Sequence, residues 1–155
     1  MRQSQYFSKT SKTAPKDDVS VNARLLEQAG FVHKEMAGVY SFLPFGMRVL
    51  SKIENIIREE MNAIGGQEVL MPALQPKENW QATGRWDGLE VLFKVKSRHE
   101  SEYALGPTHE EIVTPLGKTV IGSYRDLPLA VYQIQTKFRS EEHTSELQSL
   151  TTISY

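Results

Sequence analysis

Apolar and polar residues alternate along the chain in patterns that predict short helices and strands after a polar N-terminal arm. The arm covers residues 1–18. A short helix is expected over residues 20–29, where a Ser or Asn side chain can cap its start and Gly30 can end it. Its predicted apolar face consists of Val21, Leu25 and Ala29. Residues 31–43 alternate loosely and predict one or two short strands.

The most regular pattern predicts a helix over residues 44–64. Apolar residues within it recur at spacings of three and four and therefore share one face. They are Leu50, Ile53, Ile57, Met61 and Ile64. The strand expected next, residues 68–72, ends in Pro72, which has no N–H to donate to a neighbouring strand. A strand that ends in proline is typical of the edge of a sheet or of an interface.

The second half of the chain predicts hairpin-like strand pairs between helices. A helical turn around Trp80 is followed by a loop over residues 83–88. The remaining expected elements are a hairpin over residues 92–96 and 103–105, a helix capped by Thr108 with Glu110 and Glu111 in its first turn, and a strand over residues 129–138. Because the pairs are hairpins rather than regular βαβ units, the sequence predicts an α+β fold with an antiparallel sheet flanked by helices.

Composition narrows the class of protein. Hydrophobic residues make up 39% and charged residues 24% of the 155 residues, which excludes a wholly disordered, collagen-like or coiled-coil chain. The net charge of −1 gives no global basic field, although a local patch can still bind RNA. The chain has no Cys, which excludes a disulfide, a thiolate zinc site and a Cys nucleophile. It lacks a signal-peptide core and an apolar run of about 20 residues, so we expect a soluble, cytoplasmic protein.

Two segments carry candidate chemistry. The run Thr108-His109-Glu110-Glu111 can be an ordinary helix start, in which a Thr cap is followed by acids. Alternatively, Thr108 and Glu110 can hold a ligand ammonium, which has only donors and needs acceptors around it. Arg139 is either a surface residue or a planar charged fork for phosphate or carboxylate. Glycine loops of the Rossmann and P-loop types are absent and the histidines show no metal-ligand spacing, so we expect no metal site.

Together these segments resemble a known enzyme family. Residues 67–72, after an amphipathic helix, resemble motif 1 of the class II aminoacyl-tRNA synthetases. Residues 105–111 (Leu-Gly-Pro-Thr-His-Glu-Glu) and 132–139 (Tyr-Gln-Ile-Gln-Thr-Lys-Phe-Arg) are similar to segments of the bacterial-type prolyl-tRNA synthetases. Further agreement lies in residues 1–6, 39–49 and 84–86. The resemblance covers residues 1–138.

The resemblance implies a class II catalytic core and an ATP-dependent ligase that adenylates proline and transfers it to tRNA(Pro). Thr108 and Glu110 would hold the proline imino group. Arg139 would be the catalytic arginine that clamps the α-phosphate and the substrate carboxylate, and Glu141 would read the adenine of ATP. Mg²⁺ would accompany ATP, and its usual ligand in the family lies beyond residue 155. Motif 1 would form a homodimer interface, which gives Pro72 a role there.

The sequence departs from the family pattern near its C-terminal end. Residues 139–155 resemble the translation of a sequencing-library adapter, with two matching flanks and an index between them that keeps the frame. We therefore expect residues 1–138 to be the N-terminal part of the catalytic domain and residues 139–155 to be an adapter-derived tail. Arg139 and Glu141 then match the family by position only, and Ser140 stands where the family has an acid.

Two functions stay open at this point. The first is part of a proline–tRNA ligase, whose 155-residue chain is expected to be inactive alone because the rest of motif 2, motif 3 and the anticodon-binding domain are not in it. The second is a non-catalytic synthetase-like module that binds an amino acid or a partner protein. Motif 1 and the Thr108–Glu110 pair would serve such a module equally well. A threonyl or seryl enzyme is a weaker rival, because it lacks the corner at residues 106–110 in this setting.

Overall fold

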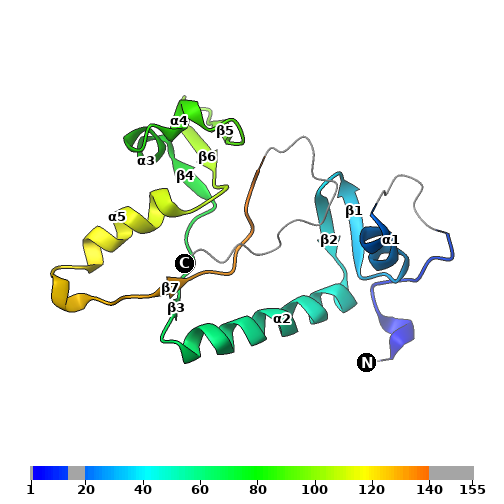
Figure 1. Cartoon of the computed structure of the whole chain (residues 1–155). Coiled ribbons are helices and arrows are strands. Elements are labelled where there is room, and N and C mark those ends of the chain that lie inside the picture. The colour runs from blue at the N-terminus through cyan, green and yellow to red at the C-terminus, as the bar shows by residue number, and fades with distance from the viewer. Residues whose placement is uncertain (1, 14–19, 140–155) are drawn as a thin grey trace. The chain divides into compact units, whose positions relative to one another are not determined.

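The computed structural model describes residues 2–13 and 20–139, which form two compact units (Figure 1). The first unit contains the described residues up to Glu59, and the second begins at Glu60. The helix α2, Pro44–Ala63, runs through the boundary between them. None of the described helices is long and apolar enough to cross a membrane.

The first unit is built on a hairpin with a helix before it and a helix after it. The hairpin consists of β1, Val32–Met36, and β2, Val39–Phe42, which pair antiparallel. Gly38 lies in its turn at φ 75°, a left-handed conformation that glycine adopts without strain. The preceding helix α1 covers Val21–Gln28, and a short 3₁₀ helix η1 lies within the N-terminal arm. The strands expected over residues 31–43 are thereby confirmed as a hairpin.

Close backbone contacts fix the start of α2. A Cβ on Gly46 would lie 2.1 Å from the carbonyl oxygen of Phe31, so the helix can approach the entry to β1 only with glycine at this position. Beside it, the ring of Phe45 stacks on Tyr6 from the arm, with ring centroids 4.6 Å apart. The Nη1 of Arg48 donates a hydrogen bond of 3.0 Å to the hydroxyl of Tyr6. The N-terminal arm is therefore attached to α2.

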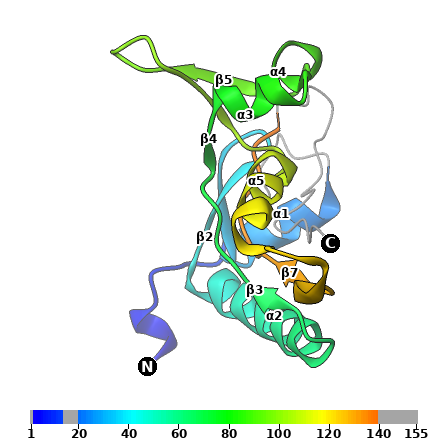
Figure 2. The same cartoon turned by 90° about the vertical axis from the view of Figure 1, so that its left-hand side faces the viewer.

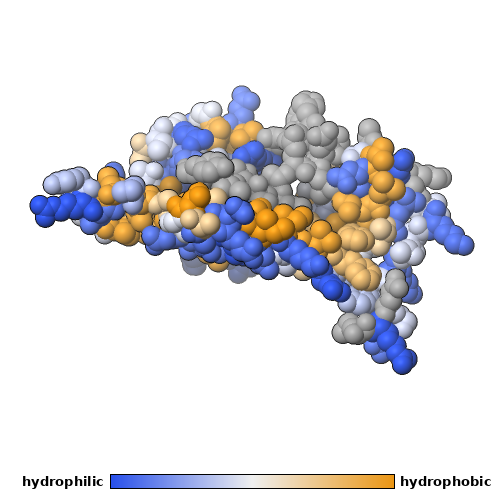
Figure 3. All heavy atoms as spheres, turned by 60° about the horizontal axis from the view of Figure 1, so that its bottom comes forward, coloured by the Kyte–Doolittle hydropathy of each residue, from blue (hydrophilic) through white to orange (hydrophobic). Residues whose placement is uncertain are grey.

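The two predicted helices of this unit are present, but their predicted faces differ from the structure. In α1, Val21 is 59% exposed and Leu25 is 56% exposed, whereas Ala23 is fully buried. The small Ala23 side chain allows α1 to lie close to its neighbours, and the larger residues remain at the surface. The apolar stripe of α2 is also not a buried face, because Ile53 is 49% exposed and Ile64 is 72% exposed. Figure 3 shows apolar side chains of this kind at the surface between charged ones.

The second unit has a three-stranded antiparallel sheet in the order β4-β6-β5. Its elements are β3 (Gln67–Glu68), β4 (Leu74–Pro76), α3 (Lys77–Ala82), α4 (Arg85–Gly88), β5 (Phe93–Lys96), β6 (Glu102–Leu105), α5 (Glu110–Val120), the 3₁₀ helix η2 (Tyr124–Asp126) and β7 (Val131–Tyr132). The helices α3 and α4 lie beside the sheet, and α5 follows β6 through a short turn (Figures 1 and 2). The predicted hairpin is confirmed as β5–β6, and β4 adds a third strand to it.

Two tryptophans form the core of the second unit. Trp80 of α3 is fully buried and Trp86 of α4 is 5% exposed, and they pack with Leu92 and with Ala104 of β6. Burial of a large aromatic side chain contributes about 1.5–3 kcal/mol, so this cluster supplies much of the unit's packing energy. The cluster places α3 and α4 beside the strand that leads into α5.

Several predicted elements of the second unit are shorter than expected or of another kind. Residues 83–88 are not a loop throughout: Gly84 turns the chain at φ 71°, and α4 follows because burial of its tryptophan holds the next residues against the core. The strand predicted over residues 68–72 is reduced to β3, and the strand predicted over 129–138 is reduced to β7. These two pair in parallel, unlike the other strands. Beyond β7 the N–H of Phe138 donates to the carbonyl of Gly106 at 3.2 Å, in the turn after β6.

Candidate functional site

The candidate site lies at the turn from β6 into α5, residues Gly106, Pro107 and Thr108. The N–H of Gly106 donates to the carbonyl of Ala73 at 2.8 Å, and its carbonyl accepts from the N–H of Phe138 at 3.2 Å. The turn is therefore held from both sides of its backbone. A Cβ on Gly106 would lie 2.1 Å from Nε2 of Gln75, so only glycine fits at this point.

Gln75 connects the sheet to this turn. Its side chain is fully buried, and its Nε2 donates a 3.0 Å hydrogen bond to the carbonyl of Thr108. Its Oε1 is buried and has no hydrogen-bond partner among the described residues. A buried acceptor without a partner is costly unless a donor from elsewhere reaches it. The amide therefore fixes the backbone of the turn and leaves one acceptor for a further donor.

Thr108 and Glu110 are the two residues that sequence analysis selected here. The hydroxyl of Thr108 is buried and makes no hydrogen bond of good geometry within the described chain. Glu110 is exposed, and although burial raises its pKa, the Thr108 hydroxyl, its own backbone amide and the charges of Arg85 and Lys137 together lower it. The site thus offers a carboxylate with a lowered pKa next to a hydroxyl, and the oxygen atoms of both groups can accept, which suits a ligand with N–H donors and positive charge.

The helix begins one residue later than predicted. The N-cap residue is His109 rather than Thr108, and no side chain caps the helix. The carbonyl of Thr108 is occupied by Gln75, while the carbonyl of His109 accepts from the N–H groups of Ile112 at 3.0 Å and Val113 at 2.8 Å. Thr108 is therefore not the N-cap residue, and its side chain does not cap the helix.

His109 is buried at the base of the site. Its Nε2 lies 3.1 Å from the carbonyl of Pro72, and its Nδ1 contacts Nζ of Lys137. Burial lowers the pKa of His109, and the charge of Lys137 lowers it further, so the neutral ring donates from Nε2 and accepts at Nδ1. Burial likewise lowers the pKa of Lys137, against the opposing effect of Glu110. Pro72 therefore has a role within the chain as a hydrogen-bond acceptor.

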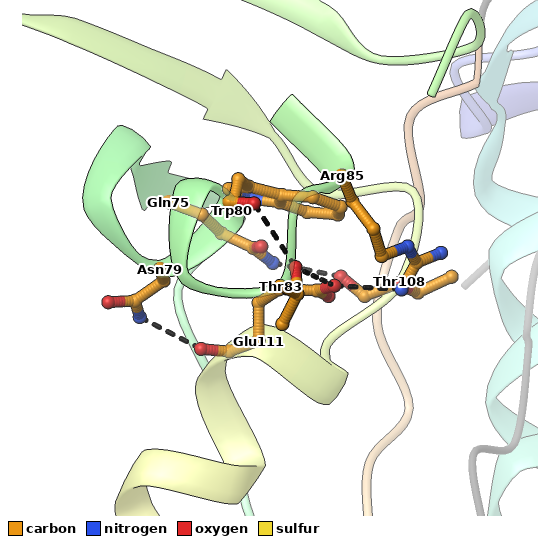
Figure 4. Close-up of polar contacts among 7 residues, drawn as sticks. All are labelled: Gln75, Asn79, Trp80, Thr83, Arg85, Thr108 and Glu111. Atoms are coloured by element: carbon orange, nitrogen blue, oxygen red, sulfur yellow. Dashed lines mark hydrogen bonds and ion pairs between the residues drawn. The ribbon is translucent and has the colours of Figure 1, made fainter. Parts of the chain in front are cut away.

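A second cluster surrounds Glu111, the neighbour of Glu110 (Figure 4). The Glu111 residue is 3% exposed, and its Oε1 accepts from Nη1 of Arg85 at 2.7 Å and from the hydroxyl of Thr83 at 3.3 Å. Its carbonyl accepts from Nδ2 of Asn79 at 2.8 Å. Sequence reasoning placed Glu111 only as a first-turn acid. Its partner Arg85 lies in the Gly-Arg-Trp run at residues 84–86, and nothing local in that run indicates that the arginine pairs with a buried acid.

The other predicted residues lie in different places. Arg139 is described and exposed, and its charge contributes to the lowered pKa of Lys137 two positions before it. Glu141 lies outside the described residues, as does most of the predicted tail. Pro72 is exposed, and its place in a dimer interface stays a prediction. Among the described residues no group of three or more His, Asp or Glu side chains could hold a metal ion.

Sequence reasoning also missed Gln133, which lies in the segment leading to Lys137. The residue is 1% exposed, and neither its amide nitrogen nor its amide oxygen has a hydrogen-bond partner within the described chain. Residues at alternate positions of an extended segment share a face, which relates Gln133 to Lys137. The polar groups on this face were visible in the alternation of residues 132–138, but the pattern alone does not distinguish a buried polar face from a solvated one.

Known proteins resemble the chain in both sequence and fold. The family model of the class II tRNA synthetase core domain (G, H, P, S and T) matches residues 93–151. A proline–tRNA ligase of Thermotoga neapolitana is 54% identical over 143 residues, which is 91% of this chain and 25% of that protein. The proline–tRNA ligase of Geobacillus kaustophilus is 52% identical over 143 residues, which is 92% of this chain and 25% of that protein.

Solved structures agree with the sequence matches. Giardia lamblia prolyl-tRNA synthetase, solved in complex with prolyl-adenylate, matches with a TM-score of 0.67 and 27% identity over 76% of this chain and 25% of that chain. A structure described as the RNA binding domain of threonyl-tRNA synthetase from Cryptosporidium parvum has a TM-score of 0.68 at 24% identity, over 76% of this chain and 30% of that chain, and supports the fold alone.

Both comparisons bear out the fold class expected from the sequence, the α+β core of the class II synthetases. The chain spans about a quarter of the length of the curated relatives it matches. Its identity to several proline–tRNA ligases exceeds half of the aligned residues, and the family model matches residues 93–151. Over about nine tenths of its length the chain is similar to bacterial proline–tRNA ligases, and residues 93–151 match the core domain of the class II tRNA synthetases.

Proposed function

We propose that residues 1–138 are the N-terminal part of the catalytic domain of an ATP-dependent proline–tRNA ligase. In this reaction a carboxylate oxygen of proline attacks the α-phosphorus of ATP and pyrophosphate leaves. A hydroxyl of the terminal ribose of tRNA(Pro) then attacks the prolyl carbonyl carbon, and AMP leaves. Such chemistry needs positioned substrates and stabilised charge rather than a protein nucleophile. The absence of Cys from the chain is compatible with it.

The observation that carries the proposal is the pair Thr108 and Glu110 at the start of α5. The amine of proline at neutral pH is a cation with two N–H donors and no acceptor. Glu110 supplies a carboxylate whose pKa is lowered, in part by the Thr108 hydroxyl, and Thr108 supplies a second acceptor oxygen beside it. The free Oε1 of Gln75 lies on a side chain that contacts the same turn. Acceptors therefore outnumber donors at the place where the ligand amine would bind.

Arg139 and Glu141 enter the proposal only because they stand at positions where the family has functional residues. A guanidinium offers a charged fork that suits the α-phosphate and the proline carboxylate at the end of the extended segment. Glu141 would accept from the adenine amino group. ATP would enter with Mg²⁺ as its usual complex, and the described residues hold no cluster that would bind the metal by itself. If residues 139–155 are an adapter-derived tail, other residues fulfil these two roles in the native enzyme.

The assembly follows from the same resemblance. We propose a homodimer formed through α2 and residues 67–72, and the exposed apolar residues of α2 support a covered face there. They are Val49, Ile53 and Ile56, which share one face at spacings of four and three. The tRNA partner and a cytoplasmic location follow from a role in translation. On its own, the 155-residue chain is expected to be inactive, because it spans only a quarter of its relatives.

Proline-dependent exchange of pyrophosphate into ATP tests the proposal. The enzyme is expressed from the complete locus, with the nucleotide sequence read through codon 139 to establish the native residues there. Glu110→Gln is expected to raise KM for proline by about 10- to 100-fold while KM for ATP is unchanged, because only the proline amine loses its counter-charge. The matched control is Glu78→Gln, an exposed acid in the first turn of α3.

Each outcome of this experiment decides between the two functions. Exchange that depends on proline, with a selective effect of Glu110→Gln, supports the ligase. A wild-type protein that binds proline but catalyses no exchange supports the non-catalytic module. Exchange that depends on threonine or serine instead of proline contradicts the proposed substrate. Exchange by the purified 155-residue chain would contradict the expectation that it is inactive alone.

A further inference from the structure

Two adjacent acids at the start of α5 have opposite environments. Glu110 is exposed, whereas the Glu111 side chain is 1% exposed and accepts from Nη1 of Arg85 at 2.7 Å. The hydroxyl of Thr83 also lies within 3.3 Å of this carboxylate, but it has a second acceptor in the carbonyl of Trp80 at 3.1 Å. Because a hydroxyl has one proton, it can serve only one of these acceptors at a time. Arg85 is therefore the permanent charged donor to Glu111.

The position of Arg85 is itself fixed by the core. Its guanidinium carbon lies 5.5 Å from the centroid of the Trp80 ring, within range of a cation–π interaction. Trp80 is fully buried among the residues of the core cluster. Figure 4 shows the guanidinium reaching from beside this ring to the Glu111 carboxylate. The ion pair thus joins the core of the unit to the first turn of α5.

The backbone of Glu111 is attached to the same part of the unit. Residue 115 would normally donate its N–H to the carbonyl of Glu111, four positions earlier, but Pro115 has no N–H. Nδ2 of Asn79 in α3 supplies the missing donor at 2.8 Å. Glu111 is therefore held through both its side chain and its carbonyl by residues of α3 and α4, while its own helix turn is weakened by the proline.

We propose that Arg85 is a positioning residue for the ligand amine. Its ion pair with Glu111 fixes the first turn of α5, so that the preceding residue, Glu110, presents its carboxylate beside Thr108. Arg85 does not contact the ligand, and its charge also helps to keep Glu110 ionised. The inference rests on the proposed function for its ligand, but the immobilisation of the turn is a property of the chain alone. The two acids have separate tasks: Glu111 anchors the turn and Glu110 meets the ligand.

Hydrogen exchange of the 155-residue chain tests the immobilisation directly. The amides of Ile112 and Val113 donate to the His109 carbonyl and report on the first turn. Arg85→Met keeps an unbranched side chain against Trp80 but removes the ion pair, and it is expected to speed exchange of these amides about tenfold or more. Lys94→Met is the matched control, because Lys94 also lies over a tryptophan, Trp86, at 5.1 Å, and pairs with the exposed Asp87. It should leave the two amides unchanged.

A double variant separates positioning from stability. Arg85→Met alone leaves the buried Glu111 carboxylate without its counter-charge, which can unfold the unit. Arg85→Met combined with Glu111→Gln removes that buried charge and should recover the thermal midpoint, while the amides of the first turn continue to exchange fast. Arg85→Lys keeps the charge but loses the planar fork, and it should give an intermediate rate.

Kinetics of the enzyme from the complete locus provide the second readout. The double variant is expected to raise KM for proline by about 10- to 100-fold, the effect of a misplaced binding group, with KM for ATP unchanged. The proposal is overturned if the folded double variant matches the wild type in both exchange and KM, or if Lys94→Met produces the same changes. If the wild-type enzyme shows no proline-dependent exchange, the proposed function fails, and hydrogen exchange alone still decides whether the ion pair immobilises the turn.

Discussion

Replacing Gly106 with alanine tests how closely Gln75 packs against the turn that carries Thr108. An ideal Cβ at this position would lie 2.1 Å from Nε2 and 2.8 Å from Cδ of Gln75, whereas ordinary contact begins at 3.4 Å. The amide would have to move by about 1 Å. Gln75 is fully buried, and such a shift breaks its 3.0 Å bond to the Thr108 carbonyl.

The expected loss of stability has two parts. Overpacking of a close contact costs about 1–3 kcal/mol, and leaving a buried carbonyl without its donor costs about 1–3 kcal/mol. Gly106→Ala should therefore lower the free energy of unfolding by about 2–6 kcal/mol. Urea denaturation followed by tryptophan fluorescence measures the stability of the second unit, which contains Gly106. Both tryptophans of the chain, Trp80 and Trp86, lie in the core of that unit.

A matched glycine and a double-mutant cycle make the result decisive. Gly88→Ala is the control, since a Cβ there meets nothing within 4 Å, and it should change stability by less than about 0.5 kcal/mol. In a Gln75→Ala background, Gly106→Ala should cost clearly less, because the side chain nearest to the new Cβ has been removed and only the Thr108 carbonyl oxygen, at 3.0 Å, remains close. The reasoning is refuted if Gly106→Ala is as mild as the control, or if its cost is the same with and without Gln75.

Two further predictions concern protonation and the helix start. Because the pKa of His109 lies below its usual 6.5, the unfolded chain takes up a proton at higher pH than the folded chain, and the free energy of unfolding should fall as pH decreases through 6.5. Urea melts at pH 7.5 and 5.5 should show a smaller decrease for His109→Gln than for the wild type, and an equal decrease would contradict this. Asn79→Ala should lower the free energy of unfolding by about 1 kcal/mol in the wild type. In a Pro115→Ala background it should have almost no effect, because the N–H of Ala at position 115 can donate to the carbonyl of Glu111. Equal losses in the two backgrounds would refute the idea that Asn79 replaces the missing helix donor.

Local patterns in the sequence predicted much of the fold. The long helix before Gly65, the β1–β2 hairpin and the β5–β6 hairpin each follow from short-range alternation and from glycines that end an element. The elements that were wrong depend on distant partners. The strand that was expected over residues 129–138 finds a partner only at β3, far away in the sequence, and elsewhere its backbone meets the Gly106 turn.

In the candidate site, too, the sequence indicates some residues, whereas others depend on distant partners. Thr108 and Glu110 could be selected from the sequence, because a hydroxyl and a carboxylate beside a Gly-Pro turn form a recognisable combination. Arg85 and Gln75 could not be selected, because nothing local distinguishes an arginine that pairs with a buried acid from a surface arginine, or a buried glutamine from an exposed one. Their roles arise from the packing of α3 and α4 beside β6, which only the three-dimensional structure shows.

The spacing of these partners along the chain has a consequence for how the site is assembled. The hydrogen bonds from Gln75 to Thr108 and from His109 to Pro72 join residues 33 and 37 positions apart, and the bond between Tyr132 and Asn62 spans 70 positions. Contacts between distant residues form only after the entropy of closing a long loop has been overcome, whereas hairpins such as β5–β6 close over a few residues. We therefore expect the turn at Thr108 to form late in folding. During synthesis it cannot take its final form until Phe138, which donates to Gly106, has left the ribosome.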